Sequence, residues 1–175
     1  MLMMAKRGKA SQDDIVEGVQ NVIDEMRLMI DSMDSVGESL SSALAIFRRR
    51  MVPRIEAAGF TCDWQMADDC PLPDYGPRDV LQIFRILQEA VTNSLKHSGG
   101  DRISIRIGAG NDAAWPTCIV LADNGKGQAL REGPGRGLAN MRARAAGIDA
   151  HLDIATTPTG VIVTLDLPAG RKRPR

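Results

Sequence analysis

Residues 88–97 read Gln88-Glu89-Ala90-Val91-Thr92-Asn93-Ser94-Leu95-Lys96-His97. On a helix, Glu89, Asn93, Lys96 and His97 are spaced so that they share one face. A carboxylate and an amide oxygen one turn apart suit Mg²⁺, which favours oxygen ligands and keeps several waters. The ammonium of Lys96, one turn further along, can meet a phosphate. A polar, solvated helix face is the alternative, and the segment taken alone fits that alternative better.

A second polar segment, Asp123-Asn124-Gly125-Lys126-Gly127, follows the short buried strand predicted at Ile119–Leu121. The carboxylate of Asp123 can accept a hydrogen bond from an exocyclic amine, and the glycines allow a flat ring to approach the backbone. The alternative is an ordinary turn, since Asp, Asn and Gly are common turn residues.

A third segment, Gly133-Pro134-Gly135-Arg136-Gly137-Leu138, opens a helix. Glycines at a helix N-terminus expose N–H groups and the positive end of the dipole to an anion such as phosphate. No Gly-Lys-Ser/Thr follows and the G-x-G-x-x-G spacing is missing, so the segment is not a P-loop. It is a flexible connection or a phosphate loop. Together, the three segments supply what an adenine nucleotide requires.

Strands and helices alternate around these segments. The patterns predict helices over Arg78–Ser98 and Leu138–Ala146, and strands at Thr61–Met66, Ile103–Ile107, Ile119–Leu121, Leu152–Ile154 and Val161–Leu167. Gly99-Gly100 ends the first of these helices.

The first third of the chain has a different pattern, in which apolar residues recur with the alternating spacing of a heptad. They are Ile15, Val19, Val22, Met26, Met29, Met33, Val36, Leu40, Ala43 and Phe47. A helix over residues 12–50 is predicted, capped by Ser11 and stopped by Pro53 and Gly59. Its apolar stripe is expected to pack on a partner helix.

Composition excludes several classes of protein. The 175 residues carry 22 basic and 22 acidic side chains, a balance that argues against a nucleic-acid binder. A count of two histidines argues against a multi-histidine metal site, and Cys62, Cys70 and Cys118 have no CxxC or Cys/His spacing. With no membrane-length apolar run and no signal peptide, we expect a cytoplasmic chain without membrane contact, compatible with a membrane-anchored parent protein.

The three segments resemble, in order and spacing, the N, G1 and G2 boxes of the histidine kinase, gyrase, Hsp90 and MutL ATPase superfamily. The resemblance spans residues ~60–168, and its G2 part is Gly135-Arg136-Gly137-Leu138-Ala139-Asn140-Met141. It implies an α+β, two-layer α/β sandwich of the Bergerat type, with a mixed sheet covered by helices and a long helix before it. The implied domains are a partial dimerisation and phosphotransfer hairpin at 1–58, an ATP-binding domain at 59–170 and a basic tail at 171–175.

The form of the boxes resembles that of sensor kinases of the nitrate-sensor and thermosensor class. This implies ATP and Mg²⁺ as cofactors, a response regulator as partner, and a homodimer formed through the 12–50 helix. Asn93 would be the main Mg²⁺ ligand with Glu89 assisting, and Lys96 would meet the phosphates as the third catalytic residue. Asp123 would accept from the adenine amine. The remaining ATP-binding residues would be His97, Gly125, Gly127, Gly135, Arg136, Gly137 and Leu138.

Neither His97 nor His151 has the setting of the accepting histidine in this class, which precedes an acidic residue on the first hairpin helix. We therefore expect the phosphoacceptor to lie outside this chain. Two departures from the resemblance are Gly160-Val161, where Gly-Thr is common, and Asp149, where Gly is common. The alternatives are a stand-alone serine kinase or anti-sigma-type regulator, and a non-catalytic dimerisation module with a vestigial ATP site.

Overall fold

The computed structural model describes residues 40–127 and 136–170. Its sheet has five strands in the order β1-β2-β3-β5-β4, and β1 pairs with β2 in parallel while all other neighbours are antiparallel. The strands are β1 (Thr61–Met66), β2 (Arg102–Asp112), β3 (Trp115–Asp123), β4 (His151–Thr157) and β5 (Gly160–Leu167). β2 and β3 extend well beyond the segments predicted for them.

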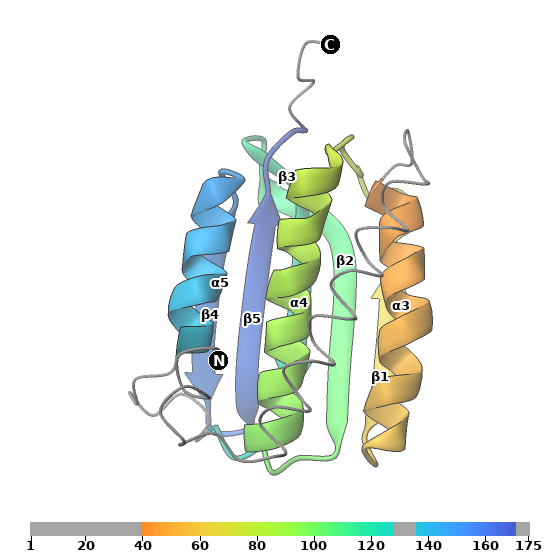
Figure 1. Ribbon diagram of the computed structural model, residues 1–175, viewed down its shortest axis with the longest axis vertical. Helices are drawn as coiled ribbons and strands as arrows, with labels where there is room; N and C mark the ends of the chain where they lie inside the picture. The colour runs from red at the N-terminus through yellow and green to blue at the C-terminus, as the bar shows by residue number, and fades with distance from the viewer. Residues whose placement is uncertain (1–39, 128–135, 171–175) are drawn as a thin grey trace, which may run out of the picture. The chain divides into compact units, whose positions relative to one another are not determined.

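Three helices of the described residues, α3 (Leu40–Ala57), α4 (Pro77–His97) and α5 (Arg136–Gly147), lie on one face of this sheet (Figure 1). Alternation places Ile103, Ile105 and Ile107 of β2 beneath them, each at most 2% exposed. The architecture is the two-layer α/β sandwich with a mixed sheet that the family resemblance implied.

Helix α4 is the central helix and carries the polar face discussed above. Pro77 stands at its start, where a missing N–H costs nothing. One side of α4 is buried at Ile83, Leu87 and Ala90. Its end at His97, followed by Gly99 with φ of 62°, agrees with the prediction.

Helix α3 packs within the domain, which corrects the predicted packing of its residues on a partner helix. Phe47 lies with its ring centroid 5.3 Å from that of Phe84 on α4 and 6.2 Å from that of Trp64 on β1. Leu44 is buried, whereas Ala43, the predicted stripe residue, is not fully buried. The apolar stripe of residues 40–55 therefore meets α4 and the sheet. α3 belongs to the same compact unit as the sheet, so this unit extends N-terminal to the domain boundary predicted after residue 58.

The end of α3 also differs from the prediction, because the helix continues through Pro53 to Ala57. Proline removes one helical hydrogen bond, but Arg49 and Pro53 are both on the exposed side, where water can satisfy the freed carbonyl. Gly59, with φ of 85°, ends the helix as predicted. Residues 12–39 of the predicted long helix and the tail at 171–175 lie outside the described residues.

Candidate functional site

The carboxylate of Asp123, at the end of β3, is only 7% exposed. Its Oδ2 accepts a hydrogen bond of 2.8 Å from the hydroxyl of Ser94 on α4. Its Oδ1 accepts from the backbone N–H groups of Gly125 at 3.0 Å and Val161 at 3.2 Å. Donors from a helix, a turn and a neighbouring strand thus fix the orientation of this buried acid.

Gly160 makes the close approach of β5 to Asp123 possible. Its φ is 133°, and a Cβ there would lie 1.9 Å from the backbone oxygen of Asp123. The next residue, Val161, lacks the hydroxyl that the resemblance would place there, but its backbone N–H still contacts the carboxylate.

A narrow cavity adjoins Asp123 between α4, α5 and the sheet. Its volume of about 20 Å³ is room for roughly one water molecule. The described residues that line it are Ala90, Asn93, Ser94, Asp123, Leu138, Met141, Ile154, Val161 and Val163. Three predicted site residues, Asn93, Asp123 and Leu138, are therefore brought together, and the remaining lining is largely apolar.

The other predicted site residues of α4, Glu89, Lys96 and His97, do not line this cavity. Glu89 is half-buried beside the start of α5, where a Cβ on Gly137 would come within 2.1 Å of Glu89 Oε1. Lys96 and His97, at the C-terminal end of α4, are exposed. The predicted polar face is thus divided between the cavity, the α4–α5 contact and the surface.

The glycines of the turn after β3 have a packing role in this structure. A Cβ on Gly125 would lie 2.2 Å from the backbone oxygen of Ser98, and one on Gly127 would lie 2.1 Å from that of Thr157. These glycines let the turn approach α4 and β4 closely. Gly135 lies outside the described residues, and Arg136 is the first residue of α5.

Two residues that hold the site together were missed in the sequence. Ser94 is 3% exposed and continues the apolar side of α4, four residues after Ala90. A serine in such an apolar stripe indicates that its hydroxyl has a buried hydrogen-bond partner. Asn124 ties the turn to the start of β2, because its Oδ1 accepts from the N–H groups of Asp101 at 3.0 Å and Arg102 at 2.9 Å.

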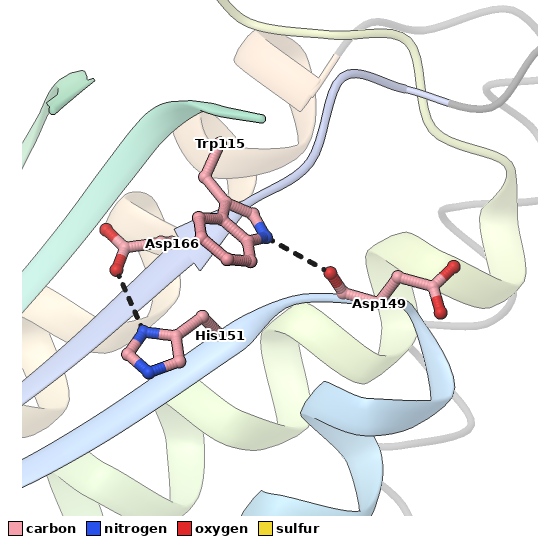
Figure 2. A network of polar contacts seen from close by, with 4 residues as sticks. All are labelled: Trp115, Asp149, His151 and Asp166. Carbon is pink, nitrogen blue, oxygen red and sulfur yellow. Dashed lines mark hydrogen bonds and ion pairs between the residues drawn. The ribbon is translucent and has the colours of Figure 1, made fainter. Parts of the chain in front are cut away.

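His151 lies in a separate polar network at the surface (Figure 2). Its Nδ1 is 3.2 Å from Oδ2 of Asp166, and its ring centroid is 5.6 Å from that of Trp115. The indole N–H of Trp115 donates to the backbone oxygen of Asp149 at 3.3 Å. Burial and a hydrogen bond to Asp166 raise the pKa of the neighbouring Cys118 thiol to about 12. No residue of this network lines the cavity beside Asp123.

Comparison with known proteins connects this geometry to a family. The model of the histidine kinase-, DNA gyrase B- and HSP90-like ATPases matches residues 78–171. This segment contains all of α4 except Pro77, the turn after Asp123 and the whole of α5. The chain belongs to this ATPase family. The sequence resemblance is thereby confirmed, and ATP is the ligand that family membership implies.

Curated relatives of this ATPase chain include sensor proteins. Sensor protein VraS of Staphylococcus haemolyticus is 34% identical over 93 residues, which are 51% of this chain and 26% of the relative. VraS of Staphylococcus aureus strain COL is 33% identical over 93 residues, again 51% of this chain and 26% of the relative. The chain thus matches about a quarter of the length of these relatives.

Solved histidine kinases share the fold of this ATPase family member. The Erythrobacter litoralis EL346 blue-light activated histidine kinase aligns with a TM-score of 0.67 and 18% identity, covering 88% of this chain and 49% of that one. The Acinetobacter baumannii histidine kinase AdeS aligns with a TM-score of 0.60 and 13% identity, covering 96% of this chain and 91% of that one.

None of the helices that the structure describes is both long and apolar enough for a membrane span.

Proposed function

We propose that this chain is the ATP-binding catalytic part of a two-component sensor histidine kinase, which transfers the γ-phosphate of ATP to a histidine on a dimerisation helix. The observation that carries the proposal is the buried carboxylate of Asp123, which opens onto a cavity shared with Asn93 and Leu138. Family membership and sensor-protein relatives support the same assignment.

Asp123 is suited to recognise the adenine amine. A carboxylate offers about four lone-pair sites, and the described residues use two on Oδ1 and one on Oδ2. One acceptor position on Oδ2 therefore remains for an amine. A purine needs more room than about 20 Å³, so binding is expected to widen the space between α4 and α5.

The donor set beside the cavity fits Mg²⁺ bound together with a nucleotide. The described residues contain no group of three His, Cys, Asp or Glu side chains that would hold a metal by itself. Mg²⁺ at kinase sites needs only one or two protein oxygens, because phosphates and waters complete its coordination. Asn93 would supply the amide oxygen and Glu89 would assist, and the bound ion would neutralise phosphate charge. Lys96 would add a positive charge toward the phosphates.

Both histidines have positions that favour an acceptor elsewhere. His97 ends α4, and His151 is held beside Asp166 in the network remote from the cavity. We propose that the acceptor lies on a hairpin helix outside this chain, and that residues 12–39 belong to the same dimerisation hairpin. A response regulator would then receive the phosphoryl group.

Titration with a fluorescent ATP analogue, with and without Mg²⁺, tests the nucleotide site. We expect saturable binding, weakened by Asp123→Asn by about 1–3 kcal/mol because an acceptor for the amine is lost. Asp153→Asn, the same change at an exposed position of β4, should leave the affinity unchanged. No binding near millimolar concentration would exclude an ATP site.

Transfer is tested by incubating the chain with γ-labelled ATP and a protein that carries a complete dimerisation hairpin with its histidine. The label should appear on that histidine as an acid-labile, alkali-stable phosphoryl group. Binding of ATP without any transfer would retain the ATP-binding function and overturn the kinase assignment.

A further inference from the structure

Strand β1 is an open edge of the sheet, since β2 is its only neighbour among the described strands (Figure 1). The N–H of Thr61 donates to the backbone oxygen of Asp101, and that of Ala67 donates to Ile107, so the odd-numbered residues of β1 turn their backbone groups toward β2. Because backbone groups alternate along a strand, those of Cys62, Trp64 and Met66 point outward, where no other described strand pairs with them.

A groove borders this edge on the helical side, between β1 and the N-terminal half of α3. Its volume is about 440 Å³. The residues that line it are Ser41, Leu44, Ala45, Arg48, Trp64, Gln65 and Met66. Met66 is 44% exposed and is the only large hydrophobic side chain of the described residues that is exposed. This groove thus combines an apolar wall with one arginine.

A second groove, of about 400 Å³, borders the same edge on the face of the sheet opposite the described helices. Across the sheet, Gln65 of β1 is in register with Arg106 of β2, and Arg106 pairs with Val120 of β3. Two residues further along β2, Gly108 pairs with Cys118 of β3. Gly108 has no side chain, which leaves the face hollow beyond the end of β1. Both grooves include Gln65 and Met66, so they meet on opposite faces of one short stretch of strand.

The charges along the two grooves have one sign. Arg48 and Arg106 are exposed, and neither makes a hydrogen bond or ion pair with any residue in the described part of the chain. No acidic residue of that part lines either groove. The nearest carboxylate on β1, that of Asp63, accepts a hydrogen bond of 3.1 Å from Nε2 of Gln65. The C-terminal end of β1 is therefore flanked by two arginines that form no ion pair with another described residue.

We propose that the β1 edge binds an extended, acidic segment of a protein partner by strand addition. The backbone of that segment pairs with the outward groups of Trp64 and Met66, and its successive side chains enter opposite grooves. Two adjacent acidic residues then meet Arg48 on one face and Arg106 on the other. Apolar neighbours cover Met66 and Val120. The choice of an acidic partner rests on these two exposed arginines, one on each face, which form no ion pair within the part of the chain that the structure describes.

Fluorescence anisotropy tests this with a labelled eight-residue peptide of valine and threonine that carries a central pair of glutamates, titrated with the full 175-residue chain. Arg48→Glu and Arg106→Glu should each weaken binding at least about tenfold. Arg78→Glu, on an exposed arginine of α4 outside both grooves, should not change it. The ATP analogue is titrated in the same samples, where the Arg48 and Arg106 variants should bind it normally.

The backbone component is tested separately. Met66→Pro removes an outward N–H while leaving the bonds to β2, and should abolish peptide binding, whereas Met66→Val should retain most of it. The same peptide with alternate backbone nitrogens methylated should not bind.

Four results would overturn the proposal: no saturable binding at millimolar peptide, equal binding of a lysine-pair peptide, equal binding of the methylated peptide, or unchanged affinity in both arginine variants. Sedimentation of the chain alone provides a further check. Self-association that Met66→Pro abolishes would likewise overturn the proposal, because the occupant of the edge would then be a second copy of the chain.

Discussion

The hydroxyl of Ser94 on α4 donates a 2.8 Å hydrogen bond to Oδ2 of Asp123 at the end of β3. Both side chains are at most 7% exposed. This contact joins the helix that carries Asn93 to the strand that carries Asp123, the carboxylate proposed to bind the adenine amine. Asn93 and Asp123 are therefore positioned relative to each other by a hydrogen bond that Asn93 itself does not make.

Ser94→Ala should lower both stability and nucleotide affinity. The buried carboxylate loses one of its three donors, which costs about 1–3 kcal/mol for an acceptor left unsatisfied. Urea unfolding measures the change in the free energy of unfolding, and analogue titration measures the affinity. Thr92→Ala removes a hydroxyl from a half-buried position of the same helix and should change neither quantity by more than about 0.5 kcal/mol. Equal effects of the two variants would contradict the role given to Ser94.

Several residues of this site could be predicted from the sequence because the patterns that indicate them are short. The spacing of Glu89 and Asn93 on α4 and the turn after Asp123 each lie within a few residues. The bond between Ser94 and Asp123 spans 29 residues, and no local pattern contains it. The position of Ser94 on an apolar stripe showed only that a buried partner was needed.

The packing of α3 shows the same limit. An apolar stripe indicates that one side of a helix is buried, but it does not identify the element against which that side packs. The heptad spacing of residues 12–50 favoured a partner helix, whereas residues 40–55 meet Phe84 and Trp64 of their own domain. Pro53 was likewise wrongly predicted to end the helix. The proline removes one helical backbone hydrogen bond, but on the exposed side of α3 water can replace it.

Gly160→Ala should be strongly destabilising. The position has φ of 133°, and the added Cβ would meet the backbone oxygen of Asp123 at 1.9 Å. Backbone strain of this kind costs about 1–3 kcal/mol, and the clash displaces Asp123 as well, so nucleotide binding should fall with stability. Gly147→Ala is the control, because an added Cβ there would have no described atom within 4 Å apart from its chain neighbours and the backbone of its own helix. It should be neutral or stabilising by up to about 1 kcal/mol, since alanine favours a helix. Both are measured by thermal unfolding.

Asp149 ends α5 in the way that Gly59 ends α3. The N–H of Ala150 donates to Ala145 at 3.0 Å and that of Asp149 to Ala146 at 3.2 Å, which is a Schellman motif. Asp149 is the only non-glycine residue of the described chain with positive φ, at 55°. We expect stability in the order glycine, aspartate, alanine at this position, with steps of about 1 kcal/mol. The bond from Trp115 is to the backbone and persists in all three, and an order with alanine first would contradict this account.

Cys118 should be the slowest thiol of the chain toward alkylation. Burial, then its hydrogen bond and proximity to Asp166, raise its pKa from 9.0 to about 12. Because only the thiolate reacts, its reactive fraction at pH 8 is about 1000-fold below that of an ordinary cysteine. Iodoacetamide labelling followed by peptide mass spectrometry gives the rate for each cysteine.

Asp166→Asn should then speed alkylation of Cys118. The substitution removes the negative charge that opposes the thiolate, so the pKa falls and the thiolate fraction at pH 8 rises, by about tenfold for each pKa unit. Burial is the larger cause and remains, so the rate should stay below that of an exposed cysteine. His151→Asn is the control, because it removes the imidazole beside Asp166 and leaves the carboxylate in place. If His151→Asn accelerated the reaction as much as Asp166→Asn, local loosening of β4 and β5 rather than the charge of Asp166 would govern the thiol.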